Sequence, residues 1–448
     1  MHNIVITELR SFLSQYKDIV SIKPEESYKL VTISNKGIIN LRNIVQGVEI
    51  KGDTAYRVKS GSFIYSRLAA HTGSFGLVPR ELDGAIVTSE MPVFEINQDI
   101  ILSDYLLHLL RQKKFLNILV QLTKGMGRVR IKEDSFLNIK LPIHNDVVDQ
   151  KRVIESLNSK FENIEALDNK YSEQIGIIAQ TRQALLQEAI EGKLTANWRL
   201  EHSELIKGDN HASKLLEKIK SERARLVEEG KVRKEKPLLP ISGDKNPFEL
   251  PDGWVWCRFG DYAFFERGKF SIRPRNDKSC FGGRYPFIQI HSLSNNGDVI
   301  KEYSQTLNDK GFSVSKQFEK GTIAVAIVGG TIGNLGILGL DMCFPDSMIG
   351  IRPMPNVNQD YVLLLLKSKQ VVIRKAAYQM AGQPNIKLPT LSELVIALPP
   401  LPEQQAIVDR MESLLSMIEE LEKQVLERNE QSEMLKQSVL REAFANSD

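Results

Sequence analysis

The sequence has few of the features on which secreted, membrane or metal-dependent proteins are built. It contains three cysteines, Cys257, Cys280 and Cys343, with no CxxC pair and no neighbouring pair of histidines. This usage argues against a disulfide framework and a zinc site, and it suits a reducing compartment. No run approaches about eighteen apolar residues, and the first residues, MHNIVITELRSF, lack the basic and then apolar order of a signal peptide. We therefore expect a cytoplasmic protein.

Motifs of DNA-modifying and nucleotide-binding enzymes are also missing. A DNA adenine methyltransferase needs an [DNS]PP[YF] motif to stack the flipped base, and the nearest match, Asn246-Pro247-Phe248, lacks the second proline. No GxGxxG follows an expected strand and there is no GxxxxGK[ST], so a Rossmann or P-loop site is unsupported. Pro345-Asp346 lacks the acid-x-Lys that would complete a nuclease metal site, and the histidines never fall at metal-ligand spacing. We predict no catalytic residue, no metal site and no cofactor in this chain.

The length and the charge pattern divide the chain. Its 448 residues are 42% hydrophobic and 26% charged, which is typical of a globular protein with two or three domains. The net charge of +3 is distributed as +5 over residues 1–140, −2 over 141–200, +1 over 201–250, +5 over 251–397 and −6 over 398–448. Basic blocks suit a polyanion, because each neutralised phosphate releases a counterion. A charge of +5 over such a length is also ordinary for a protein surface.

An internal repeat is the strongest signal in the sequence. The segment QKRVIESLNSKFENIEALDNKYSEQ, from Gln150, aligns without a gap with QQAIVDRMESLLSMIEELEKQVLER, from Gln404. The same offset aligns QALLQEAIEGKL, from Gln183, with QSVLREAFANSD, from Gln437. A repeat of this long period divides the chain into two halves, each a globular block followed by a helical block.

Both helical blocks show the alternating three- and four-residue spacing of a coiled-coil seam. The expected seam residues are Ile154, Leu157, Phe161, Ile164 and Tyr171 in the first block and Val408, Met411, Leu415, Ile418 and Val425 in the second. The polar interruptions Asp168 and Arg182 recur as Glu422 and Lys436, and polar seam residues fix register. One such stripe could belong to a helix packed on its own domain. Two matched stripes predict that the helices, each about 40 residues long, pack together.

The globular blocks mix short β-like runs with helices. In the first block we expect strands at 28–33, 62–65, 85–87 and 93–96 and a helix at 103–122. In the second we expect strands at 322–328 and 348–351 and a helix at 359–369, while 212–229 reads as an exposed charged helix. The predicted class is α+β: two globular mixed α/β domains separated by two long antiparallel helices that form a coiled coil. The expected parts are 1–140 and 251–397 (globular domains), 141–200 and 398–448 (long helices) and 201–250 (a charged helix and Pro-rich connector).

Several segments together resemble the specificity subunits of type I restriction–modification systems. They are GSFIYSR (61–67), QALLQEAIEGKLTANWR (183–199), ASKLLEKIKSERARLVEEGKVRK (212–234), PFELPDGWVWCRFGDY (247–262) and MAGQPNIKLPTLSELVIALPPLPEQQAIV (380–408). The resemblance covers essentially the whole chain in the family's order. One departure is LPIHNDVVDQ, from Leu141 to Gln150, which lacks most prolines of the matching LPPLPEQ segment.

The resemblance implies a non-catalytic subunit of a prokaryotic complex. Each recognition domain would bind one half of a split asymmetric target in double-stranded DNA, and the helices would set the spacer. The partners would be two methyltransferase subunits and two motor–nuclease subunits. The assembled complex would be an adenine-specific DNA methyltransferase and ATP-dependent endonuclease. S-adenosylmethionine, ATP and Mg would bind the partner subunits.

Side-chain chemistry suggests which residues would contact DNA. Arg and Lys suit guanine and phosphate, and Asn and Gln suit adenine. The candidates in the first domain are Lys59, Arg67, His71, Thr72, Lys124, Arg128 and Arg130. Those in the second domain are Arg267, Lys269, Arg273, Arg275, Gln379, Gln383, Asn385 and Lys387.

Two other classes of function stay open at this point. The first is a coiled-coil scaffold that joins two protein-binding domains, for which DNA would be irrelevant. The second is a self-sufficient DNA methyltransferase or nuclease, which would be active as the purified chain alone. A salt-sensitive gel shift separates the scaffold from a DNA-binding protein, because phosphate contacts weaken as salt rises.

Overall fold

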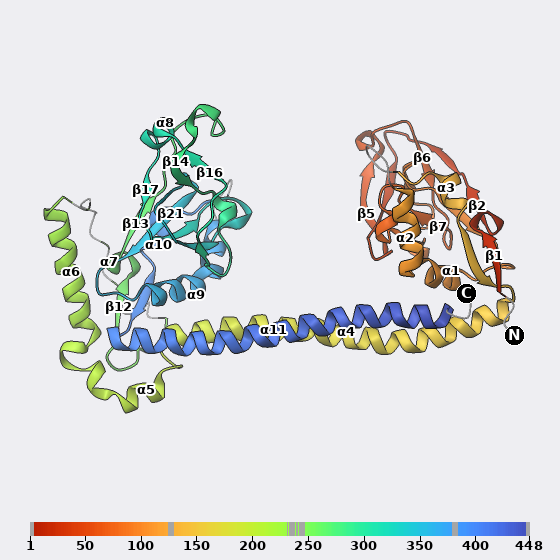
Figure 1. Cartoon of the computed structure of the whole chain (residues 1–448). Helices are drawn as coiled ribbons and strands as arrows, with labels where there is room; N and C mark the ends of the chain where they lie inside the picture. Colours follow the sequence, from red (N-terminus) through yellow and green to blue (C-terminus); the bar gives the residue numbers. More distant parts are fainter. Residues whose placement is uncertain are drawn as a thin grey trace. The chain divides into compact units, whose positions relative to one another are not determined.

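The computed structural model describes residues 4–123, 130–230, 232, 238, 241, 247–378 and 384–444. The chain divides into two compact units (Figure 1). Unit 1 comprises residues 1–174 and 424–448, and unit 2 comprises residues 175–423. Each of the two long helices therefore contributes residues to both units.

Unit 1 holds two main sheets and a strand pair beside short helices. Its strands are β1 (Ile4–Glu8), β2 (Leu13–Tyr16), β3 (Ile19–Ser21), β4 (Ser27–Ile33), β5 (Ile39–Gln46), β6 (Thr54–Arg57), β7 (Phe63–Tyr65), β8 (Phe75–Leu77), β9 (Ile86–Val87), β10 (Val93–Ile96) and β11 (Lys140–His144). Its helices are α1 (Ser103–Leu110), α2 (Lys113–Leu122), α3 (Glu133–Leu137) and the first part of α4 (Val147–Ile190). The sheet orders are β3-β6-β9-β4-β5, β2-β10-β7-β8 and β1-β11.

Unit 2 contains more elements. Its strands are β12 (Val255–Arg258), β13 (Ala263–Arg267), β14 (Phe281–Phe287), β15 (Val299–Ile300), β16 (Gln305–Leu307), β17 (Gln317–Phe318), β18 (Ile323–Ala326), β19 (Leu335–Leu338), β20 (Met342–Cys343), β21 (Met348–Pro353) and β22 (Val395–Leu398). Its helices are α5 (Ala196–Glu201), α6 (Ala212–Glu228), α7 (Phe259–Tyr262), α8 (Asp309–Ser313), α9 (Gln359–Tyr378), α10 (Leu388–Ser392) and the first part of α11 (Leu401–Phe444). The sheet orders are β13-β21-β18-β19-β15, β16-β14-β20-β17 and β12-β22.

The two units share one plan in the part that adjoins the long helices. The order β2-β10-β7-β8 in unit 1 matches β13-β21-β18-β19 in unit 2, and the strand pair β1-β11 matches β12-β22. The central strands β7 and β18 are fully buried, as their apolar sequences FIY and IAVA require. The remaining sheets differ in strand number and order between the units. The internal repeat therefore extends into the globular blocks, which diverge in their outer sheets.

A buried glutamine attaches each globular block to its long helix. The side-chain amide of Gln150 accepts a hydrogen bond from the backbone N–H of Leu102 (2.9 Å) and donates one to the backbone carbonyl of His144 (2.8 Å). The repeat-related Gln404 accepts from the Asn358 amide (3.0 Å) and donates to the Pro399 carbonyl (3.0 Å). Both glutamines are 0% exposed. Because each one satisfies free backbone groups at the start of a helix and at the end of a strand, it fixes where the long helix leaves its domain.

Helices α4 and α11 pack against each other through the expected stripe. The seam side chains are all buried or half-buried, and Leu157, Ile164, Val408, Met411, Ile418 and Val425 are the fully buried ones. Two ion pairs in unit 1 show in which direction the helices run relative to each other: Lys160 lies 3.4 Å from Glu442, and Lys436 lies 2.5 Å from Asp168. Because the residue number rises along α4 while it falls along α11, the two helices are antiparallel. The predicted fold class is confirmed.

The structure also differs from the expected elements. The helix expected at 103–122 is broken after Leu110, and Gln112 is extended (φ −65°, ψ 140°). The cause is tertiary: Gln437 of α11 accepts from the Lys113 amide (3.0 Å) and donates to the Arg111 carbonyl (3.3 Å). The first long helix begins at Val147, after strand β11, and ends at Ile190. Just beyond it Gly192 has φ +73°, which favours glycine and ends the helix.

Candidate nucleic-acid interface

Three arginines of unit 2 converge on one aspartate. Arg275 Nη2 lies 2.5 Å from Asp346 Oδ1, and Arg273 Nη2 lies 3.4 Å from Asp346 Oδ2. Arg267 Nε donates to the Asp346 backbone carbonyl at 2.7 Å. Arg273 and Arg275 are about half exposed, at 54% and 49%. Three cations against one carboxylate leave a surplus of positive charge at the surface, so this cluster is suited to an anionic ligand.

Backbone packing explains why the arginine segment lies beside Asp346. The Gly268 amide donates to the Met348 carbonyl (2.9 Å), and the Lys269 amide donates to the Phe344 carbonyl (3.1 Å). A Cβ atom at Gly268 would lie only 2.2 Å from the Pro345 carbonyl oxygen. Glycine is therefore required where the segment after β13 approaches residues 344–348.

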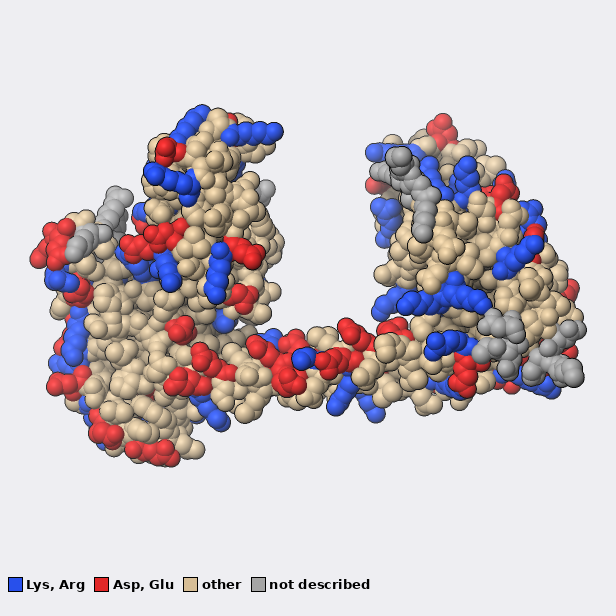
Figure 2. Space-filling view, in the orientation of Figure 1, with Lys and Arg blue, Asp and Glu red and all other residues tan. Residues whose placement is uncertain are grey.

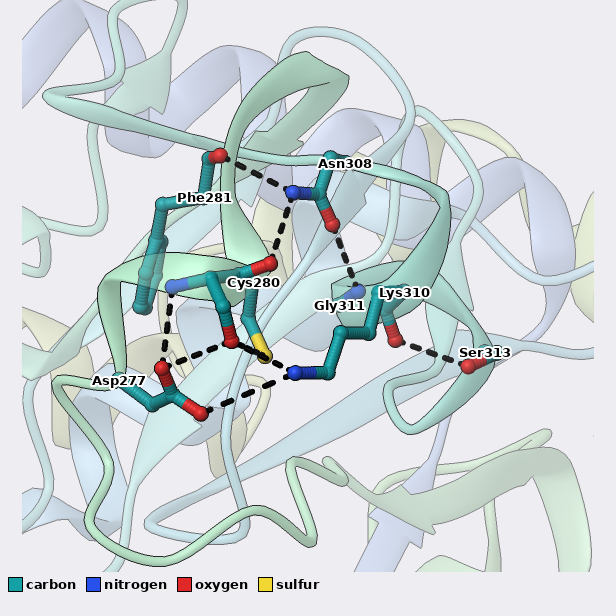
Figure 3. A network of polar contacts seen from close by, with 8 residues as sticks. Asp277, Cys280, Phe281, Asn308, Lys310, Gly311 and Ser313 are labelled. Carbon is teal, nitrogen blue, oxygen red and sulfur yellow. Dashed lines mark hydrogen bonds and ion pairs between the residues drawn. The ribbon is translucent and has the colours of Figure 1, made fainter.

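A polar network holds the far end of the arginine segment (Figure 3). The Lys310 ammonium donates to Ser279 Oγ (2.6 Å) and lies 4.0 Å from the Asp277 carboxylate. The Asn308 amide donates to the backbone carbonyls of Ser279 (3.0 Å) and Phe281 (3.2 Å) and caps α8 by accepting from the Gly311 amide. Residues 268–277 are thus anchored at both ends, which restricts the arginines they carry.

Lysine and arginine side chains gather around this end of unit 2 (Figure 2). Besides the cluster, Arg284 is 79% exposed and Lys310 is 58% exposed. Arg284 lies 5.0 Å from the centre of the Tyr285 ring and donates to its hydroxyl at 2.8 Å, which raises the pKa of the Arg284 guanidinium. An aromatic ring beside a guanidinium can stack on a base or position the cation at a phosphate.

The other candidates of unit 2 lie on separate segments. Lys269 and Lys387 are exposed. Asn385 forms an isolated bridge with Val328, directly before the glycine turn at 329–331, and its buried Oδ1 has no hydrogen-bond partner among the described residues. A buried polar atom without a partner is costly unless a ligand satisfies it. Gln379 and Gln383 lie outside the described residues.

In unit 1 each described lysine and arginine candidate has its own acidic partner. Lys59 lies 2.6 Å from Glu95 and Arg130 lies 2.9 Å from Glu90. Arg67 pairs with Glu133, and its side chain is only 28% exposed. These three sites are close to neutral, in contrast to the cluster at Asp346. Arg67 and Glu133 both line a small cavity of about 140 Å³.

Two other unit 1 candidates, His71 and Thr72, occupy a turn between β7 and β8. His71 and Thr72 belong to the 3-10 turn Ala70–Thr72, and the Thr72 hydroxyl donates to the Ala69 carbonyl (2.7 Å). The matching turn between β18 and β19 is Gly329–Thr331. His71 and Thr331 both have a buried polar atom without a described hydrogen-bond partner. Lys124 and Arg128 lie outside the described residues.

Sequence reasoning did not identify Asp346. It lies more than 70 positions from the arginines it contacts, and in the sequence Pro345-Asp346 reads as a chance pair rather than as part of a basic cluster. The only available signal was the glycine between Arg267 and Lys269, which is compatible with close backbone packing.

Among the described residues no group of three or more His, Cys, Asp and Glu side chains could hold a metal ion. No helix within the described parts of the chain is long and apolar enough to span a membrane.

Known proteins with similar sequences point to one family. Residues 251–430 match the family described as Type I restriction modification DNA specificity domain. The chain is 30% identical over 285 residues to the Type I restriction enzyme EcoAI specificity subunit of Escherichia coli, covering 59% of this chain and 44% of that relative. It is 22% identical over 357 residues to the EcoKI specificity subunit of Escherichia coli strain K12, covering 78% of this chain and 66% of that relative. The chain thus spans less than half of the first relative.

A solved structure shows the same fold. It is described as the structural basis underlying complex assembly and conformational transition of the type I R-M system. It covers 98% of this chain and 97% of its own, with a TM-score of 0.60 and 17% identity. The matched family is one of DNA specificity subunits and not of methyltransferases or nucleases. Residues 251–430 therefore carry a type I restriction–modification DNA specificity domain, and the chain as a whole is similar to the specificity subunits of type I restriction enzymes.

Proposed function

We propose that each unit binds one half of a split asymmetric target in double-stranded DNA. The observation that carries this proposal is the repeated plan, in which β2-β10-β7-β8 and β13-β21-β18-β19 are built alike while the outer sheets differ. Two similar domains with unlike outer parts suit the reading of two unlike half-sites. Phosphate contacts would supply affinity, and side chains at base edges would supply specificity.

We further propose that the long helices set the spacer and recruit methyltransferase subunits. The charge of the C-terminal segment supports this proposal. Residues 398–448 have a net charge of −6, which suits contact with protein partners rather than with DNA. In this proposal the complex also contains two motor–nuclease subunits, and S-adenosylmethionine, ATP and Mg bind the partner subunits. The chain itself catalyses no step and resides in the prokaryotic cytoplasm.

The direct test of the proposed function is methylation mapping. The chain is co-expressed with its methyltransferase subunit, and methylated adenines are located in the host genome. We expect one split motif with a fixed non-specific spacer, lost when the gene for this chain is deleted. Methylation that persists without the chain, or that shows no two-part motif, would overturn the proposal.

Lengthening the helices tests their role as a spacer ruler. One heptad is inserted into both α4 and α11, at matched positions beside Asp168 and Lys436 so that the seam stays in phase. Seven helical residues add about 10 Å, so we expect the spacer to grow by about three base pairs while both half-sites stay the same.

The matched control is an insertion into α4 alone, which breaks the pairing and should abolish methylation. An unchanged spacer with the double insertion, in a complex that still methylates DNA, would contradict the ruler.

A further inference from the structure

We propose that Asp346 is a positioning residue that orients Arg273 and Arg275 and so determines the base specificity of unit 2. This inference rests on the proposed function. A mobile guanidinium near DNA binds phosphate and adds affinity without sequence preference. A guanidinium held in one orientation can instead place two parallel donors on guanine O6 and N7. The contacts of Asp346 hold the guanidiniums of Arg273 and Arg275 in defined orientations.

Each oxygen of the Asp346 carboxylate takes a different arginine. Oδ1 lies 2.5 Å from Arg275 Nη2, and Oδ2 lies 3.4 Å from Arg273 Nη2. Arg273 Nη1 also donates to the Phe270 and Ile272 carbonyls, at 2.8 Å each, so this guanidinium is fixed from two sides. A guanidinium has five donors in a rigid fork, and Arg275 uses one of them on Asp346. The rest of its fork is available to a ligand.

The backbone of Asp346 is fixed as well. Its carbonyl accepts from Arg267 Nε at 2.7 Å, and the following Met348 amide donates to the Pro345 carbonyl at 3.2 Å. The Asp346 side chain is 35% exposed, which is less than the exposure of Arg273 and of Arg275, the two arginines that its carboxylate contacts. The carboxylate therefore lies beneath the guanidiniums as a support, where it can direct them without occupying the surface they present.

Simple charge neutralisation does not account for this arrangement. In unit 1, Lys59, Arg67 and Arg130 each have a separate carboxylate partner. At Asp346 a single carboxylate contacts two arginines while the backbone carbonyl of the same residue binds a third, so positive charge is left in surplus. An orienting role and a neutralising role predict different effects when the carboxylate becomes an amide.

The test is the Asp346→Asn variant. The amide keeps the shape of the side chain but puts an NH2 donor in place of one carboxylate oxygen, so the arginine that contacts that oxygen loses its acceptor. The full chain, co-expressed with its methyltransferase subunit, is used to select binding sites from a pool of randomised DNA duplexes. Binding to a duplex without the selected site is measured over a range of salt concentrations.

The matched control is Glu319→Gln. Glu319 is in the same unit and pairs with one arginine, Arg352, at 2.9 Å, outside the cluster. Both variants remove one negative charge from unit 2, and therefore differ only in which arginines are released.

We expect Asp346→Asn to bind non-specific duplex more tightly and to lose base preference, about tenfold at a guanine position, in one half-site only. The other half-site, read by unit 1, stays fully selected and shows that the variant is folded. Glu319→Gln should keep both half-sites. If Asp346→Asn keeps full preference in both half-sites, the inference about Asp346 is wrong. If the wild-type chain enriches no motif, the proposed function itself fails.

Discussion

Glu403, a carboxylate with 0% exposure near the start of α11, accepts hydrogen bonds from three different side chains. The Thr195 hydroxyl donates to Oε1 (2.7 Å), the Trp254 indole donates to Oε2 (2.7 Å), and Arg199 forms an ion pair with Oε1. These donors come from the segments after α4 and before β12. A single buried charge therefore joins the connector of unit 2 to its long helix.

Removal of this carboxylate should destabilise unit 2. We expect Glu403→Ala to lower the free energy of unfolding by about 3–5 kcal/mol, because Arg199 stays buried without its partner. Urea unfolding followed by tryptophan fluorescence measures the change, and Trp254 lies at the site. The control is Glu217→Ala, which breaks an exposed pair with Lys214 and should leave the midpoint nearly unchanged. Equal effects of the two variants would contradict the role given to Glu403.

At the scale of elements, two ion pairs between repeat-related residues join the long helices α4 and α11. Asp168 and Glu422 are repeat-related, as are Arg182 and Lys436. Asp168 pairs with Lys436 at 2.5 Å in unit 1, and Glu422 pairs with Arg182 at 2.8 Å in unit 2. The acidic member of each copy thus meets the basic member of the other. These pairs interrupt the apolar stripe and restrict the register of the helices.

A double-mutant cycle on Asp168 and Lys436 tests the unit 1 pair. Both side chains are about a quarter exposed, so we expect a coupling of about 1 kcal/mol at pH 7 in urea unfolding of Asp168→Asn, Lys436→Met and the double variant. The exchange of the two residues, Asp168→Lys with Lys436→Asp, should recover most of the loss. A coupling near zero, with no recovery, would show that the register depends on the apolar stripe alone.

The coupling should also depend on pH. Partial burial alone would raise the pKa of the Asp168 carboxyl, but hydrogen bonds from Lys436 and Ser432 outweigh burial and hold that pKa below its ordinary value. A lowered carboxyl pKa gives stability that is present above the unfolded-state value and is lost as the pH falls through the folded-state value. The coupling measured at pH 7 should therefore decline below about pH 4. A coupling that is unchanged in acid would contradict this assignment.

At the scale of the whole molecule, the absence of catalytic motifs becomes a prediction about where activity resides. We expect the purified chain to bind duplex DNA in a salt-sensitive manner but to transfer no methyl group and cut no DNA. Methyl transfer from labelled S-adenosylmethionine should be detected only when the methyltransferase subunit is added. Methyl transfer by this chain alone, after removal of traces of the partner, would contradict the proposal.

The sequence by itself determined the repeat, the two long helices and their seam. These features are periodic and local: apolar positions such as Leu157 and Met411 recur at helical spacing, and burial of such a stripe requires a partner helix. The motifs of the family were equally legible, because they are contiguous. The class of the molecule and the family therefore followed from residues that are neighbours in the chain.

Only the tertiary structure decided the break at Gln112, which depends on Gln437, and the cluster at Asp346, which depends on arginines distant in sequence. Sequence patterns carry no signal for such contacts, because side-chain hydrogen bonds join residues that only the packing of separate strands and helices brings together. The sequence shows where the basic residues are in the chain. Whether the charge of each one is neutralised, as that of Arg67 is by Glu133, depends on which carboxylate the fold places beside it.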